Sequence, residues 1–187
     1  MLRRLIVPVL IVAILGGVAG VAYASHGHGD DGELDQVKEG LAQFRSVPVA
    51  EGAGYKLLLD AKGIACIDLP GTGGMGVHYV NSALVGDGSV DPATPEAVVF
   101  EPDGRGRLHL AAAEYVVLEE AWDSQHNDKP SLFGQTFALT PAGNRYGLPA
   151  FYSLHAWLFD HNPAGMFAMW NPAVTCTPDD VHGGGQG

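Results

Sequence analysis

Two histidines and one glutamate lie at strand-like positions of this sequence where a polar side chain needs a partner. His78 is part of "GMGVHYVN", Glu114 of "LHLAAAEYVVL" and His155 of "FYSLHAWLF". Two neutral imidazoles and one carboxylate form a common protein site for a divalent transition metal and leave coordination positions open. We therefore predict a site for Zn, Cu, Fe or Mn formed by His78, Glu114 and His155.

Chemistry at such a site would use the open position. A bound ion there could polarise a small substrate or activate water, with Glu114 as a catalytic candidate and Tyr79 or Tyr115 as a nearby proton donor. The partner of the protein is then a metal ion or a small-molecule ligand. The sequence leaves open whether the protein is an enzyme or only binds the metal.

The prediction depends on the alternation of side chains along a strand. Alternation places Glu114 in an otherwise apolar row, and burying an unpaired carboxylate is costly. The members of that row are Leu108, Leu110, Ala112, Glu114, Val116 and Leu118. It also places His155 in an aromatic row that contains Phe151, Ser153, Trp157 and Phe159.

Two other interpretations stay open. A buried histidine that is hydrogen-bonded to a buried glutamate satisfies both groups without a metal, so His78 and Glu114 could form a structural pair in an interaction domain. Alternatively, the protein is a non-enzymatic module for a small apolar ligand. The residues that would line its pocket are Phe151, Trp157, Phe159, Phe167 and Trp170.

A run of glycines precedes His78 in "LPGTGGMGVHYVN". It lacks the lysine and the following helix of a phosphate-binding loop, so it does not predict a nucleotide site. Small residues within a strand instead leave space for a ligand or another backbone to approach closely.

The first 24 residues read as a secretory signal peptide. Arg3 and Arg4 precede an apolar core, and Ala22-Tyr23-Ala24 matches an A-x-A cleavage site. We expect cleavage after Ala24 and a secreted or cell-envelope protein that does not stay in the membrane; an uncleaved membrane anchor is the competing interpretation. The new terminus, Ser25-His26-Gly27-His28, offers nitrogen ligands for Cu(II), although it also suits an idle tail.

The net charge and the two cysteines narrow the possible partners and the covalent structure. The chain has 10 Lys+Arg and 21 Asp+Glu, and loss of the two signal arginines leaves 8 basic residues and a net charge of −13. This acidic surface argues against nucleic-acid binding. Cys66 and Cys176 are the two cysteines, and outside the cytoplasm we expect them to form one disulfide.

The pattern of the mature chain predicts one α+β domain, residues 33–178, between a polar tail (25–32) and a glycine-rich tail (179–187). Apolar residues at helical spacing predict an N-terminal helix that ends at Pro48. A hairpin (97–101 and 107–119) and a strand (150–159) follow, and residues 164–170 suit a short helix. We expect a mostly antiparallel, strongly bent sheet or small barrel.

Several motifs resemble a group of exported bacterial proteins without an established activity. They are "LAQF", "GYKLL", "GMGVHYVN", "PEAVVFEPDGRGRLHLAAAEYVV", "PSLFGQTF" and "YSLHAWLFDHNPAGMFAMWNP". The resemblance covers most of the mature chain. It implies an exported single domain with histidines at set places, and it gives no reaction.

Overall fold

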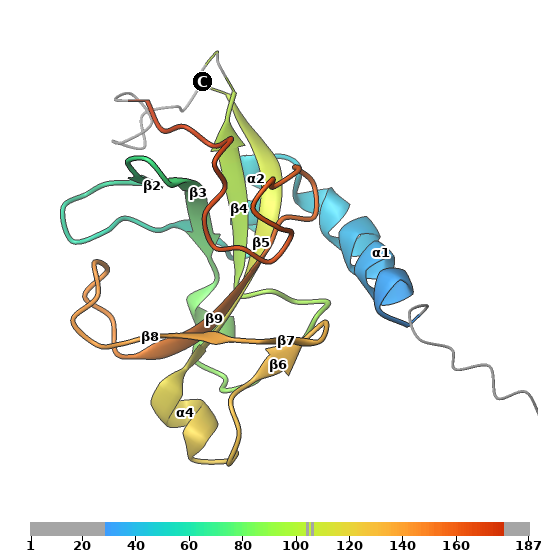
Figure 1. Cartoon of the computed structure of the whole chain (residues 1–187), viewed down its shortest axis with the longest axis vertical. Coiled ribbons are helices and arrows are strands. Elements are labelled where there is room, and N and C mark those ends of the chain that lie inside the picture. Colours follow the sequence, from blue (N-terminus) through green and yellow to red (C-terminus); the bar gives the residue numbers. More distant parts are fainter. Residues whose placement is uncertain (1–28, 104, 106, 178–187) are drawn as a thin grey trace, which may run out of the picture.

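The computed structural model describes residues 29–103, 105 and 107–177, so the predicted signal peptide, the copper-binding terminus and the C-terminal tail lie outside the described residues (Figure 1). The elements in chain order are α1 (Gly29–Leu41), a 3-10 helix η1 (Ala42–Phe44), α2 (Val47–Gly52), β1 (Lys56–Leu57), β2 (Cys66–Leu69), β3 (Gly73–Val80), α3 (Ser82–Val85), β4 (Ala97–Pro102), β5 (Leu108–Leu118), α4 (Glu119–Asp123), β6 (Ser131–Leu132), β7 (Gln135–Thr136), β8 (Ala138–Thr140) and β9 (Phe151–Ala156). The predicted α+β class is confirmed.

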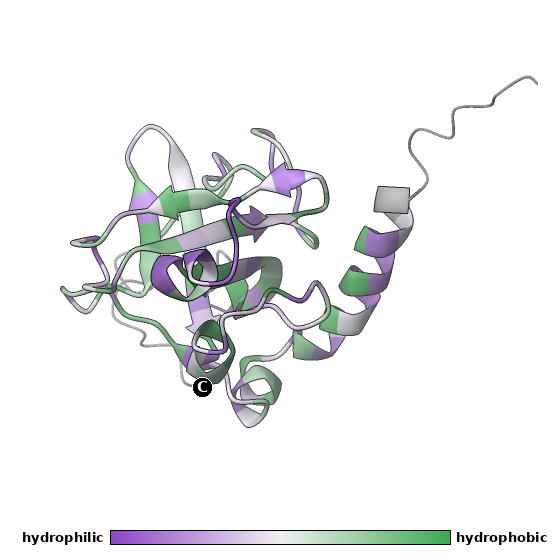
Figure 2. Ribbon diagram, turned by 90° about the horizontal axis from the view of Figure 1, so that it is seen from below, coloured by the Kyte–Doolittle hydropathy of each residue, from purple (hydrophilic) through white to green (hydrophobic). Residues whose placement is uncertain are grey.

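The N-terminal helix differs from the prediction at both ends. It already includes residues 29–32, which we expected in the tail. It does not continue to Pro48, because η1 and a break precede α2, where Pro48 occupies the first turn. A proline is tolerated there because first-turn amides have no partner within the helix. Hydrophobic and hydrophilic residues alternate along α1 (Figure 2), and its Val37 and Leu41 are buried.

One antiparallel sheet dominates the fold. Its strand order is β1-β3-β4-β5-β9-β8, and β2 also pairs with β3. The sheet bends strongly, since β8 and β9 run across the direction of β4 in Figure 1. The predicted hairpin is confirmed as β4 and β5. The predicted strand 150–159 is shorter, because β9 ends at Ala156, and residues 164–170 form turns rather than a helix.

A bulge in the hairpin changes the predicted side-chain rows. Val99 pairs with Ala112, but Phe100 pairs with Leu110, so Ala111 is an extra residue in β5. Such a bulge shifts the alternation by one residue. Leu110 therefore lies in the large core cluster and Ala112 in a small one, so the single row predicted from Leu108 to Leu118 is wrong.

The two faces of the sheet carry different clusters. The large cluster includes Val37 and Leu41 of α1 and Val98 and Tyr115 of the sheet. The small cluster lies on the other face, where the C-terminal segment packs against the sheet; its members are Val99, Ala111, Ala112, Trp157 and Val174. The residues predicted to bind metal belong to strands of this sheet.

The glycines before His78 serve this C-terminal segment. Gly74 and Asn171 exchange two backbone hydrogen bonds, of 3.0 and 2.9 Å. A Cβ at Gly74 would lie 2.6 Å from a Val174 methyl group, and a Cβ at Gly73 would collide with the Asn171 carbonyl. Close approach of another backbone, one of the two predicted uses of these glycines, is confirmed.

The predicted disulfide is confirmed. The sulfur atoms of Cys66 and Cys176 are 2.05 Å apart, and the bridge joins β2 to the C-terminal segment across 110 residues. It fastens the same segment that the glycines accommodate. Among the residues that the structure describes, no helix has the length and apolar character needed to cross a membrane.

Candidate metal centre

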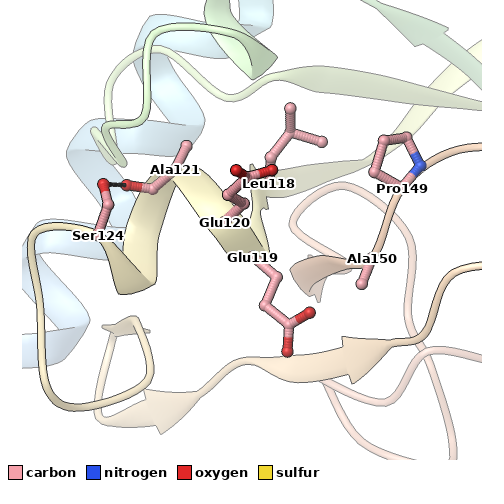
Figure 3. A pocket seen from close by; sticks show the side chains of 7 residues that line it. All are labelled: Leu118, Glu119, Glu120, Ala121, Ser124, Pro149 and Ala150. Carbon is pink, nitrogen blue, oxygen red and sulfur yellow. Dashed lines mark hydrogen bonds between the residues drawn. The ribbon is translucent and has the colours of Figure 1, made fainter.

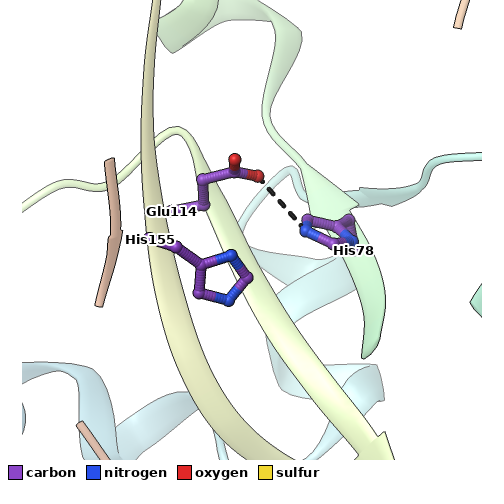
Figure 4. A group of neighbouring side chains, drawn as sticks. All are labelled: His78, Glu114 and His155. Atoms are coloured by element: carbon purple, nitrogen blue, oxygen red, sulfur yellow. Dashed lines mark ion pairs between the residues drawn. The ribbon is translucent and has the colours of Figure 1, made fainter. Parts of the chain in front are cut away.

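Three strands bring His78, Glu114 and His155 together (Figure 4). Glu114 of β5 and His155 of β9 are direct cross-strand partners, so their side chains lie on the same face. His78 comes from β3, on the far side of β4, where it pairs with Val99. One ligand atom from each of the three residues lies within 4.8 Å of the other two. The structure therefore contains the predicted grouping, which could hold a metal ion.

The intervening strand β4 has a small residue where these side chains meet. Ala97 pairs with Glu114 on one side and with Val80 on the other. It is fully buried. β3 and β5 are two strand spacings apart, roughly 10 Å, so His78 and Glu114 reach each other only over β4. The methyl side chain of Ala97 leaves that space.

His78 and Glu114 form a short polar contact. His78 Nε2 lies 3.2 Å from a Glu114 carboxylate oxygen. Burial raises the pKa of Glu114, but the hydrogen bond and charge of His78, the charge of His155 and a hydrogen bond with Ser153 outweigh it. The net pKa lies below its ordinary value. Glu114 is therefore ionised at neutral pH, as a metal ligand must be.

His155 lies in a largely apolar environment. Its ring stacks on Trp157 with centroids 4.7 Å apart and meets the His78 ring edge-on at 5.7 Å. Burial lowers its pKa to about 4; the charge of Glu114 opposes this shift and that of His78 adds to it. His155 is thus neutral at pH 7, with one ring nitrogen free of a proton. A neutral imidazole is the form that binds metals.

The histidines have three buried ring nitrogens without a hydrogen-bond partner. They are His78 Nδ1, His155 Nδ1 and His155 Nε2. The large majority of buried side-chain polar atoms have a partner, so three such atoms in one place require an explanation. The His78–Glu114 pair alone does not supply one, because it uses only one of the four ring nitrogens.

The spacing suits a metal ion. With bonds near 2.0–2.1 Å and tetrahedral angles, neighbouring ligand atoms are about 3.3–3.5 Å apart. The 3.2 Å between His78 Nε2 and Glu114 is close to this value. The limit of 4.8 Å for the grouping means that the widest pair must close by at most roughly 1.5 Å on binding.

A second grouping of possible ligands lies at the other end of the hairpin. Glu101 and His109 are cross-strand partners, and His109 Nε2 lies 2.8 Å from an Asp160 oxygen. Burial, together with the charge and hydrogen bond of Asp160, raises the pKa of Glu101 to about 7, although His109 lowers it. The His109 side chain is 48% exposed. This ring already has a partner and contacts water, so the grouping needs no metal to satisfy it.

The two tyrosines predicted as proton donors do not face the site. Tyr79 and Tyr115 follow His78 and Glu114 directly, so alternation turns both into the large core cluster. The Tyr115 hydroxyl donates to the Pro92 carbonyl at 2.9 Å. A different tyrosine, Tyr146, is affected by the site: burial raises its pKa first and the charge of Glu114 second. Nothing in the local sequence pattern marks Tyr146, because it lies in a loop.

The five aromatic residues predicted to line a ligand pocket are divided between surroundings. Trp157 belongs to the small cluster, whereas Phe159 and Phe167 pack against the large one. Trp157 and Phe159 line a surface hollow beside Lys38, but Phe151, Phe167 and Trp170 do not. A second hollow, at the end of β5, is lined by Leu118, α4 and the residues just before β9 (Figure 3). Neither hollow is lined by the three candidate ligands.

Comparisons with protein-family models, with curated proteins and with solved structures find no match. The resemblance inferred from the sequence motifs stays a prediction.

Proposed function

We propose that this protein binds a divalent transition metal through His78, Glu114 and His155. The observation that carries the proposal is His155, whose two ring nitrogens are buried beside an ionised carboxylate without any partner. A metal ion would bond one of these nitrogens, one nitrogen of His78 and one oxygen of Glu114. Nitrogen and oxygen donors of this kind suit zinc and iron, and also copper and manganese.

The energetics favour a ligand over a structural role. Each unpartnered buried polar group destabilises the fold by about 1–3 kcal/mol. Leucine or phenylalanine at position 155 would avoid that cost, so a purely structural site gains nothing from a histidine there. A metal-binding site gains a ligand that is already neutral at pH 7.

The proposal is metal binding and assigns no reaction. Catalysis at a metal needs space for a substrate at the open coordination position. The two hollows described above are not lined by His78, Glu114 or His155. The water-activating role inferred from the sequence is therefore not part of this proposal.

We also propose that the domain works outside the cytoplasm. The Cys66–Cys176 disulfide supports this, because cytosolic thiols are kept reduced. Fractionation of cells that express the full chain tests the location. The intact disulfide should appear in the extracytoplasmic fraction, and a reduced protein confined to the cytosol would contradict the proposal.

Elemental analysis tests the metal site. Untagged protein from zinc-replete cells should retain a metal ion that is lost in His155→Phe and Glu114→Gln variants. His109→Ala is the matched control, because it removes a histidine from the second grouping. Any ion held by the histidines of the N-terminal segment is common to all variants and cancels. Equal metal content in wild type and His155→Phe, with both folded by circular dichroism, would refute the proposal.

A further inference from the structure

The candidate metal centre is closed to solvent at both histidines. His78 is 2% exposed and His155 is 3% exposed. The Glu114 side chain, at 14%, is the most accessible of the three. We therefore expect an ion to enter or leave past the Glu114 side chain, after the atoms that cover that side chain move aside.

Two loops from opposite edges of the sheet contact each other, and one of them is hydrogen-bonded to the backbone of His78. One follows β1, the strand beside β3, and the Leu58 amide there donates to the His78 carbonyl at 2.9 Å. The other, residues 141–150, joins β8 to β9 and is called the strap. In Figure 1 both loops project from the same side of the sheet. Arg145 of the strap lies 2.9 Å from Asp60 of the first loop.

The link between the loops joins a buried carboxylate to a partly exposed guanidinium group. Asp60 is buried, and its Oδ1 accepts hydrogen bonds from the Lys62 and Ile64 amides. The Ile64 amide is the largest cause that keeps the pKa of Asp60 below its ordinary value; burial opposes it, and Arg145 and Lys62 add to it. Arg145, at 37% exposure, can leave this partner for water. The Ala61 amide also donates to the Arg145 carbonyl at 2.9 Å.

Hydrogen bonds within the strap and two glycine turns give it a defined shape. The Asn144 amide group donates to the Pro141 and Leu148 carbonyls, at 3.0 and 2.9 Å, and accepts from two strap amides. Gly143 and Gly147, with φ of 79° and 69°, provide turns that other residues rarely adopt. Tyr146 is half-buried and within the field of Glu114. The strap therefore lies beside the loop that is bonded to His78, and it places a partly buried aromatic side chain in the neighbourhood of Glu114.

We propose that the strap is a gate over the metal centre, held shut by the Arg145–Asp60 pair and closed by the Tyr146 side chain. The gate rests on the proposed metal site and sets how fast an ion exchanges. It makes no bond to the ion, so opening it speeds entry and release together. The equilibrium affinity then stays close to that of the wild type.

Zinc release into an excess of a chromogenic chelator, followed by stopped flow, tests the gate. Loss of the Arg145–Asp60 pair in Arg145→Ala should speed zinc release by roughly 3- to 10-fold. Tyr146→Ala should also speed release, whereas Tyr146→Phe should not. Arg107→Ala is the matched control, because it breaks the exposed Arg107–Asp103 pair elsewhere. Release rates within twofold of wild type in both Arg145→Ala and Tyr146→Ala would overturn the proposal.

A metal-free readout separates failure of the gate from failure of the metal site. Diethyl pyrocarbonate modifies accessible histidines, and mass spectrometry locates the modification. Arg145→Ala should make His78 and His155 react faster than in Arg107→Ala, with both variants folded by circular dichroism. Unchanged reactivity would refute the gate whether or not zinc binds. Faster reactivity in a protein that retains no metal ion in elemental analysis would support the gate and refute the proposed metal site.

Discussion

Replacing His155 by phenylalanine should leave the metal-free protein at least as stable as the wild type while abolishing metal binding. The substitution keeps an aromatic ring against Trp157 and removes two buried nitrogens that have no partner. Each such group destabilises the fold by about 1–3 kcal/mol. The larger phenylalanine ring offsets roughly 1 kcal/mol of the gain, because it packs the site more tightly than histidine does. The expected net effect at pH 7 is a gain of about 1–5 kcal/mol in the free energy of unfolding.

A lower pH should increase the stability of His155→Phe relative to the wild type. Burial lowers the pKa of His155 from 6.5 to about 4, against the opposing charge of Glu114, so the unfolded chain binds this proton before the folded protein does. Titration of His155 therefore leaves the free energy of unfolding of the wild type unchanged above pH 6.5 and lowers it as the pH falls toward 4. A shift of this size corresponds to about 3 kcal/mol. The His155→Phe variant lacks this loss.

Urea unfolding followed by circular dichroism, in the presence of a chelator at pH 7.5, 6 and 5, measures both effects. The variant should equal or exceed the wild type at pH 7.5, and its advantage should grow at pH 5. A variant that is less stable by more than about 1 kcal/mol at every pH, with an unchanged pH slope, would refute the reasoning. It would mean that the His155 nitrogens have stabilising partners.

Three further predictions concern the scaffold. Reduction of Cys66–Cys176 should lower the free energy of unfolding by about 4–5 kcal/mol, from the 110-residue loop, in denaturant titrations with and without reductant. Gly74→Ala should lower the free energy of unfolding by about 1–3 kcal/mol in thermal scans, because its Cβ would lie 2.6 Å from a valine methyl group. Gly40→Ala, whose Cβ would have no atom within 4 Å, is the control and should not destabilise the protein. Burial raises the pKa of Glu96 to about 7, so the contribution of Glu96 to the free energy of unfolding should fall by up to about 3 kcal/mol from pH 4.5 to 7, and Glu96→Gln should remove this part of the pH dependence.

Local patterns predicted much of the fold. Apolar residues at helical spacing predicted the N-terminal helix, in which Val37 and Leu41 are buried, and the hairpin was predicted with nearly the bounds of β4 and β5. Pro48 was misread because a proline that cannot lie inside a helix can begin one. The choice depends on where the chain turns after residue 44, which is a tertiary feature.

The candidate site was predictable where alternation held and not beyond. Glu114 and His155 lie on one face because they pair directly, as two strands of alternating residues allow. The bulge at Ala111 gave no signal, because an alanine run fits either face. Tyr146 could not be predicted from sequence, since the Arg145–Asp60 contact that fixes its loop joins residues 85 positions apart.

Anomalous diffraction from crystals grown with Zn(II) tests the central claim most directly. The account predicts a zinc peak about 2.0–2.2 Å from one ring nitrogen of His78, one of His155 and a carboxylate oxygen of Glu114. A zinc peak at Glu101, His109 and Asp160 alone would contradict the account. So would the absence of a zinc peak at His155 in a crystal where this side chain keeps the position described above.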